Sequence, residues 1–438
     1  MTITVLGLVL IPVGLVLALG RSRLPLLHLT VFFAPFTASA IVNFGAAGFG
    51  IQPGYYFATL YLARSALDGL VGERAGRLSR RQVGVLLALG VFTLVTALSV
   101  TLVPWYGHDV RVLRPSGRYE SLAFTGENVT QLLYVVFVVG LAASVGVEDL
   151  GPPRIRSLIR TLILSGVVVC VIGWIQLTLH SVGIPYPAFL FNSNESFSQL
   201  YAQTLPGLAV KRVNSVAPEP SMLARFLLIP TAIAAYAATD RRSAILPRRR
   251  AMLLTALFVT TLVLTTSSTA LVGLTAMVLF LIVHSTWRTL RGDPGWFVRL
   301  RRQLAWAVVG GLAIAASVLA LAYWWLDLDL SLLAEVANIV LLEKLGTTSG
   351  QVRLDTAIEG LELFLRFPLL GVGWGSYRTF DLGTNLLVSV GVLGFACFAW
   401  IHVSVLSAAG RLAGRLARLG HEELAALPEA MAVALITA

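Results

Sequence analysis

The stretch TTSGQVRLDTAIEGLELFLRFPLLGVGWGSYRTFDLGTN, residues 347–385, is the longest part of the chain that looks ordered yet lies outside an apolar run. It carries Arg353 near its start and continues with helical spacing up to Pro368, where the missing amide hydrogen interrupts a helix. A glycine-rich run follows at 371–375, and the polar pair Thr384-Asn385 precedes the next apolar run. The stretch predicts a helix, a tight turn and the head of a second helix.

The composition is that of a membrane protein. Hydrophobic residues make up 57% of the 438 residues and charged residues 13%, whereas soluble domains carry about 25% charged residues. The first apolar run, 3–19, has no basic segment before it and no clear small-residue cleavage site, so we interpret it as a retained span and not a signal peptide. Cys170 and Cys397 both lie in apolar runs, which argues against a disulfide framework.

Apolar runs of about 20 residues can cross a bilayer as helices. Taken together, the runs predict an all-α polytopic integral membrane protein that forms a single transmembrane domain, 1–438, with about 11–12 transmembrane helices. The C-terminal piece, 425–438, is too short to cross alone and is interpreted as part of a twelfth span. The other predicted spans lie near 3–19, 24–44, 54–71, 82–103, 128–147, 157–180, 221–239, 251–266, 269–287, 304–326 and 385–407.

Arginine clusters fall on every second connection between these runs, which places those connections on the inner side of the membrane. The same bias accounts for the net charge of +11 without a nucleic-acid partner. The N-terminus and the loops 104–127, 182–220 and 327–384 are therefore predicted to face the periplasm or the cell exterior. The inner loops contain no glycine-rich phosphate-binding loop, which argues against an ATP-driven pump.

The large outer loop 327–384 is predicted to contain two interfacial helices. Residues 331–345 have amphipathic spacing, and so do residues 351–367, in which Leu354, Ile358, Leu361 and Leu365 share one face. Helices of this kind lie in the plane of the membrane surface. Two of them would form a roof over a cavity.

Two arginines are candidates for binding a phosphorylated lipid. Arg212 stands seven residues before Glu219, at the outer end of a span, and this pair can bind a diphosphate and supply an acid or base; a snorkelling interfacial pair is the alternative. Arg353 offers the fixed fork of donors that suits diphosphate oxygens. An exposed helix charge is the alternative there.

Other residues near these arginines are candidates for contacting the substrate. Lys211 precedes Arg212, Ser221 follows Glu219, and Arg225 lies one turn into its span, where an ionisable group indicates function. The run from Gly371 through Gly373 to Gly375 follows no predicted strand and is not a nucleotide-binding loop. We interpret it as a tight turn that brings the backbone close to a ligand or a helix.

Four segments, mostly in the second half of the chain, together resemble the bacterial O-antigen polymerase and O-antigen ligase superfamily. Each segment is a loose motif alone, but the order and spacing of the four segments match those of this superfamily. They are R-x-N-S-x-x-x-E-P-S at 212–221, TTSSTALVGL at 265–274, S-G-x-x-R with P-L-L-G-V-G-W-G-S-Y between 349 and 377, and T-N-L-L-x-x-x-G-V-L-G at 384–394.

The resemblance implies a membrane glycosyltransferase that needs neither metal nor nucleotide cofactor. It would work in the bacterial inner membrane, with its active site facing outward, and transfer a glycan from undecaprenyl diphosphate to an acceptor glycan. Arg212 and Arg353 would hold the donor diphosphate, and preorganised cations stabilise the charge that develops on the leaving group. Tyr377, Thr384 and Asn385 would contact the substrate with the glycine turn. A chain-length regulator is a further candidate partner.

Thr384 departs from the pattern, because the ligases of this family have a histidine at that position. Threonine cannot accept a proton at neutral pH, so either Glu219 is the base or the reaction needs no strong base. The departure favours a polymerase of lipid-linked oligosaccharide repeat units. The alternatives are an O-antigen ligase that acts on lipid A core or another acceptor, and a transporter or flippase in which the same arginines bind but nothing is cleaved.

Overall fold

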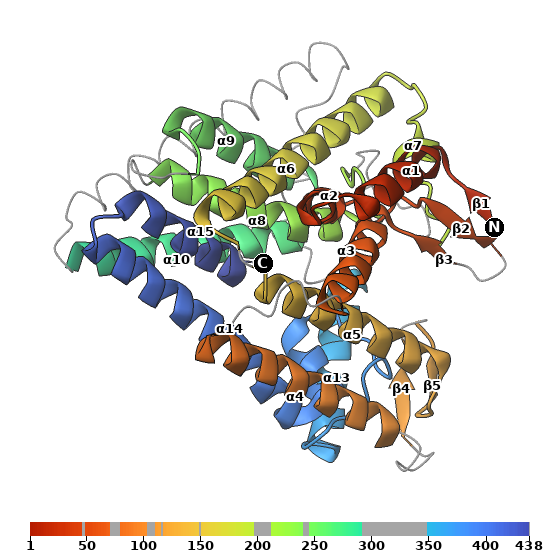
Figure 1. Cartoon of the computed structure of the whole chain (residues 1–438). Coiled ribbons are helices and arrows are strands. Elements are labelled where there is room, and N and C mark those ends of the chain that lie inside the picture. Colours follow the sequence, from red (N-terminus) through yellow and green to blue (C-terminus); the bar gives the residue numbers. More distant parts are fainter. Residues whose placement is uncertain are drawn as a thin grey trace. The chain divides into compact units, whose positions relative to one another are not determined.

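The computed structural model describes residues 1–45, 49–70, 79–102, 110–114, 117–148, 150–196, 212–239, 245–290 and 348–437, and these are mostly helical (Figure 1). Within them, five helices are long and apolar enough to cross a membrane. They are α4 (Arg80–Leu102), α5 (Gly126–Gly146), α6 (Pro152–Ser181), α8 (Pro220–Thr239) and α14 (Leu382–Arg418). This supports an all-α membrane protein. The total of about 11–12 spans stays a prediction, and the predicted span 304–326 lies outside the described residues.

The predicted span 24–44 is wrong. Helix α2 (Leu24–Phe33) ends after 10 residues, too short for the hydrocarbon core of a bilayer, and the chain turns at Pro35 before entering the strand β2 (Val42–Phe44). The segment between them is apolar because it is buried in protein: Phe36, Ala38 and Ile41 are at most 4% exposed. Hydrophobicity alone does not distinguish such a buried loop from a lipid-exposed helix.

The chain divides into two compact units, and each is described here by itself. Unit 1 comprises the described residues within Met1–Leu67, Leu150–Val340 and Ala409–Ala438, and unit 2 those within Asp68–Asp149 and Leu341–Ala408. The remaining elements of unit 1 are β1 (Thr2–Ile3), α1 (Val5–Leu19), β3 (Phe49–Ile51), most of α3 (Pro53–Leu70), α7 (Ala188–Phe191), α9 (Arg248–Leu264), α10 (Ser268–Leu290) and α15 (Glu422–Thr437). Strands β1, β2 and β3 form a small antiparallel sheet.

Helix α8 is the centre of unit 1, where it packs against α9, α10 and α15 (Figure 1). Nearly all of its residues after Leu227 are buried. Gly273 of α10 allows the close approach, since a Cβ at that position would overlap the side chain of Leu228. A helix this enclosed provides a fixed base for the loop that leads into its first turn.

A polar cluster holds the C-terminal part of α8 to its neighbours. The Tyr236 hydroxyl donates to the Glu429 carboxylate of α15, and His284 Nε2 of α10 lies 3.8 Å from the same carboxylate. Tyr236 is fully buried, and most buried polar groups in folded proteins are hydrogen-bonded. Three helices are thereby joined through one carboxylate.

Unit 2 contains α4, α5, most of α14, the helix α13 (Thr348–Arg366) and the two-stranded sheet of β4 (Arg111–Leu113) and β5 (Tyr119–Ser121). Helices α4 and α5 pack against each other. Leu386 and Val390 of α14 pack with Phe92 of α4 in a hydrophobic cluster. A second cluster joins the sheet, α13 and the segment between α13 and α14.

Helix α14 is interrupted at Gly391, whose φ of 64° and ψ of −168° are not helical. The interruption leaves carbonyls and amides of the helix without partners in their own ladder. The glycine turn, residues 368–373, supplies the missing partners. Val372 N donates to Val388 O at 2.7 Å, and Gly373 N donates to Ser389 O at 3.1 Å. In the other direction, Val392 N donates to Pro368 O at 2.8 Å. The prediction that this run is a tight turn close to a helix is confirmed.

Helix α13 is amphipathic as predicted. The four apolar residues that share one face, Leu354, Ile358, Leu361 and Leu365, are all exposed, while Thr356 and Leu363 on the opposite side are buried. An exposed apolar face is what a helix at a membrane surface requires. Its position at the membrane stays a prediction, and the other predicted interfacial helix, 331–345, lies outside the described residues.

Replacing Gly391 should destabilise unit 2. In Gly391→Ala, the new Cβ would overlap the backbone of Leu369, and a residue with a side chain at this positive φ costs a further ~1–3 kcal/mol. Thermal unfolding of the purified protein in detergent should show a clear fall in the melting temperature.

Gly410→Ala is the matched control, because this glycine lies in the same helix and nothing is within 4 Å of its Cβ position. Alanine is the better helix former there, so its melting temperature should be equal or higher. Equal stability of the two variants would contradict the proposed role of the interruption.

Candidate functional site

The segment that carries Arg212 is held rigidly in unit 1. Gln176 Oε1 of α6 accepts hydrogen bonds from the backbone amides of Asn214 and Ser215 at 3.2 and 3.0 Å. Gln176 Nε2 donates to Asn214 Oδ1 at 2.9 Å. The Ser215 hydroxyl donates to Val169 O at 2.7 Å. Asn214 and Ser215 are fully buried. This network fixes the backbone that presents Arg212.

The Arg212 side chain is fixed by the turn at the C-terminus of α9. Its Nε donates to Thr266 Oγ1 at 3.0 Å and to Thr265 O at 3.3 Å, and its Nη2 donates to Thr266 O at 3.4 Å. Thr266 has a positive φ of 47°, uncommon for a threonine. The segment 212–221 and the segment that starts at Thr265, which are far apart in the sequence, are therefore in contact.

Arg212 lines a cavity of about 390 Å³ in unit 1. Pockets for small ligands have volumes of about 300–1,000 Å³. The end of α6 and the loop after it form the rest of the described wall, and the lining residues are Gln176, Leu177, His180, Gly183, Ile184, Pro185, Tyr186, Arg212 and Val213. Burial raises the pKa of Tyr186 above its ordinary value, so the phenol is neutral at physiological pH. The charged residue of this wall is Arg212, which makes the cavity suited to an anion.

Three predicted site residues follow Arg212 closely in the sequence but are not part of the described wall of the cavity: Glu219, Ser221 and Arg225. The Glu219 carboxylate accepts a hydrogen bond from Ser221 Oγ at 3.0 Å, and the Glu219 carbonyl accepts from the amides of Met222 and Leu223. Glu219 therefore begins α8. Arg225 is exposed on the surface of α8. Lys211 lies outside the described residues.

Arg353 has a partner that the sequence did not indicate. The Arg353 guanidinium lies over the Phe380 ring with Cζ 5.5 Å from the centroid, and Arg378 lies over the same ring at 5.0 Å. Arginines stack on aromatic faces through cation–π attraction. Two half-buried arginines therefore contact one aromatic ring in unit 2.

Tyr377 is a structural residue in this fold. It is 3% exposed, and its hydroxyl donates to Thr356 O at 2.8 Å. Burial and the nearby Glu359 carboxylate raise its pKa above the ordinary value. Glu359 also accepts from the exposed Tyr119 of β5 at 2.8 Å. The predicted contact of Tyr377 with substrate stays a prediction, but the hydroxyl is engaged in holding α13.

Thr384 and Asn385 lie in the first turn of α14. Asp381 Oδ1 accepts a hydrogen bond from the Thr384 amide at 2.7 Å and so caps the N-terminus of the helix. Gly360 of α13 lets the two helices approach, because a Cβ there would lie 2.8 Å from Thr384 Cγ2. Gly371 has the same function toward α14, since its Cβ would overlap the carbonyl of Val388. Gly371 and Gly373 shape the backbone in this position.

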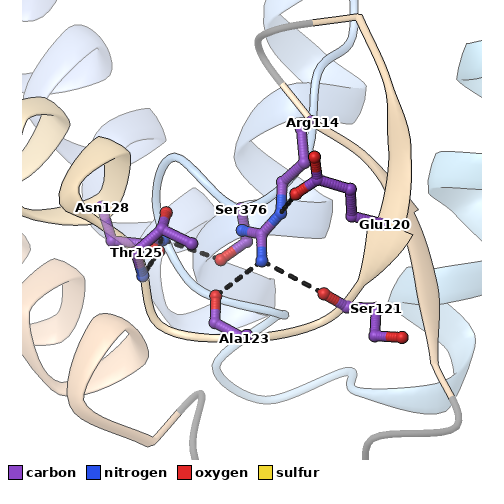
Figure 2. A network of polar contacts seen from close by, with 7 residues as sticks. All are labelled: Arg114, Glu120, Ser121, Ala123, Thr125, Asn128 and Ser376. Carbon is purple, nitrogen blue, oxygen red and sulfur yellow. Dashed lines mark hydrogen bonds and ion pairs between the residues drawn. The ribbon is translucent and has the colours of Figure 1, made fainter.

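Arg114 is a buried cation that sequence reasoning missed (Figure 2). It is 1% exposed, its Nη2 donates to Ala123 O at 2.7 Å and to Ser121 O at 3.2 Å, and its Nε lies 3.8 Å from the Glu120 carboxylate. Figure 2 shows its guanidinium directed toward Ser376, whose hydroxyl accepts from Asn128 Nδ2 at 2.8 Å. Arg114 thus ties the β4–β5 hairpin beside the glycine turn. A single arginine between apolar residues gives no signal in the sequence.

The four resembling segments meet in two pairs. The segments 212–221 and 265–274 meet through Arg212 in unit 1, and the segments 349–377 and 384–394 meet through the glycine turn in unit 2. Arg212 and Arg353 belong to different units, and their joint use stays a prediction. No protein-family model matches the chain, and no curated protein matches it significantly. The resemblance therefore continues to rest on these segments.

Removing the Arg114 side chain should loosen unit 2 locally. Arg114→Leu removes the hydrogen bonds to the carbonyls of Ser121 and Ala123, and a hydrogen bond to a charged group contributes about 1.5–3 kcal/mol. Hydrogen exchange should accelerate at the β4–β5 hairpin and across 371–376, more than in α4. The exposed Arg118→Leu is the control, and matching exchange in both variants would show that Arg114 has no such role.

Proposed function

We propose that this chain is a membrane glycosyltransferase that polymerises lipid-linked oligosaccharide repeat units. The donor would be a glycan on undecaprenyl diphosphate and the acceptor another lipid-linked glycan at the outer face of the inner membrane. The observation that carries the proposal is the fixed Arg212 on the wall of a 390 Å³ cavity at the end of apolar helices. A cation held before the ligand arrives needs no reorganisation when charge develops.

The second arginine site supports the same chemistry. Arg353 and Arg378 share the Phe380 ring, and guanidinium groups bind phosphate oxygens through paired donors that stay charged at all physiological pH values. Arg353 and Arg378 would help to neutralise a diphosphate leaving group as the anomeric bond breaks. In this mechanism the protein's own side chains supply the electrostatic stabilisation, and the lipid chain remains in the bilayer beside the apolar helices.

The mechanism makes Arg212 and Arg353 essential. Arg212→Ala should lower the rate of glycan transfer from a purified lipid-linked repeat unit by about 10²–10³-fold, the usual cost of removing one preorganised donor. Arg212→Lys keeps the positive charge but loses the paired donors of the guanidinium, so its rate should lie between those of the wild type and Arg212→Ala. Product length on gels, with the protein reconstituted in vesicles, measures both.

Arg415→Ala is the matched control, because Arg415 is an exposed arginine near the end of α14; its product length should equal that of the wild type. Normal polymer from both Arg212→Ala and Arg353→Ala would overturn the proposal. Vesicles that move intact lipid-linked glycan across the bilayer without releasing undecaprenyl diphosphate would identify a transporter instead. Transfer onto lipid A core would identify a ligase.

The predicted base Glu219 has a separate test. Glu219→Gln keeps the helix-capping carbonyl and the contact with Ser221, so the fold should be retained. If the carboxylate accepts the proton of the acceptor hydroxyl, transfer slows while donor binding is kept. An unchanged rate removes Glu219 as the base.

A further inference from the structure

We propose that His180 is the proton acceptor for the attacking hydroxyl and that the acceptor sugar binds in the Arg212 cavity, next to the donor diphosphate. This inference rests on the proposed glycosyl transfer and names its acceptor site. Arg212, Tyr186 and His180 line one cavity. Glu219, the base that the sequence favoured, is not in its described wall.

The end of α6 is built to place His180 at this cavity. Helix α6 ends at Ser181, the φ of 72° at Gly183 favours glycine, and the Ile184 amide donates to Leu179 O at 2.8 Å. This is the arrangement that ends many helices with a left-handed residue. The His180 carbonyl accepts the Gly183 amide at 3.1 Å, so the backbone of His180 is fixed.

The loop after α6 supplies a platform for a sugar ring. Pro185 and Tyr186 line the cavity, and the Tyr186 ring stacks against Phe191 of α7 with centroids 6.2 Å apart and an interplanar angle of 29°. Aromatic rings held in this way bury the apolar faces of ligands and keep a polar group at one edge. Tyr186 and Arg212 are therefore each held in place by described residues of unit 1.

The proton transfer balances with the groups at hand. The acceptor hydroxyl gives its proton to an imidazole nitrogen of His180 and forms the new bond to the anomeric carbon. The bond from that carbon to the diphosphate oxygen breaks, and its electron pair stays on the diphosphate. The C-terminus of α6 stabilises an imidazolium, whereas the nearby Arg212 opposes it. Tyr186, the other titratable group of this wall, stays neutral because burial raises its pKa.

The test compares His180→Gln with the wild type in the reconstituted transfer assay over pH 5–8. The wild-type rate should fall towards acidic pH, because a protonated imidazole cannot accept the proton. In His180→Gln the rate should drop about 10²–10⁴-fold, and this acidic limb should vanish, while binding of the lipid-linked donor is unchanged. His180→Gly should regain rate when imidazole is added.

Other results decide against the inference. A His180→Gln variant with the wild-type rate and the same acidic limb would overturn it. So would a variant that loses donor binding together with rate, or a His180→Gly variant that binds donor but is not rescued by imidazole, since these indicate a structural role. Wild-type protein that transfers no glycan at any pH would instead refute the proposed function.

Discussion

The constraint on which unit 2 depends is that backbone polar groups in apolar surroundings need partners. Gly391 interrupts the membrane-length helix α14, and the interruption is tolerated because the glycine turn 368–373 exchanges hydrogen bonds with the helix in both directions. Gly371 and Gly391 make the approach possible, since a side chain on either would overlap the other segment. These hydrogen bonds between the turn and α14 position the first turn of α14, Tyr377 and the Arg353–Phe380–Arg378 group.

Much of the fold follows from elementary patterns in the sequence. The apolar runs predicted the long helices, Pro368 and the glycines predicted the tight turn, and the spacing of Leu354, Ile358, Leu361 and Leu365 predicted an amphipathic helix. The run 24–44 failed because burial in protein and burial in lipid select the same residues, so Phe36, Ala38 and Ile41 look like a span. Length and hydropathy do not contain the information that separates them.

The catalytic and substrate-binding roles of the candidate residues stay predictions. Arg212 lines a cavity, and its contact with Thr266 joins two segments that the sequence had marked separately. The sequence did not indicate Arg114, Arg378 or His180, because only the folded chain shows what each contacts. Arg114 donates to a carbonyl after the hairpin, Arg378 lies over the Phe380 ring, and His180 lines the cavity. No spacing rule along the chain encodes such neighbours. Glu219 was placed by sequence beside Arg212, but its backbone and carboxylate serve the start of α8.

The broken helix also constrains the order in which the chain enters the membrane. Without the turn, the amides and carbonyls around Gly391 would lose their partners, and within a bilayer each unsatisfied group costs several kcal/mol. The partners lie only about 20 residues earlier in the chain, so the loop that joins them closes at little entropic cost. We therefore expect α13, the turn and α14 to leave the insertion machinery as one hairpin, with the turn already folded when the helix partitions into lipid.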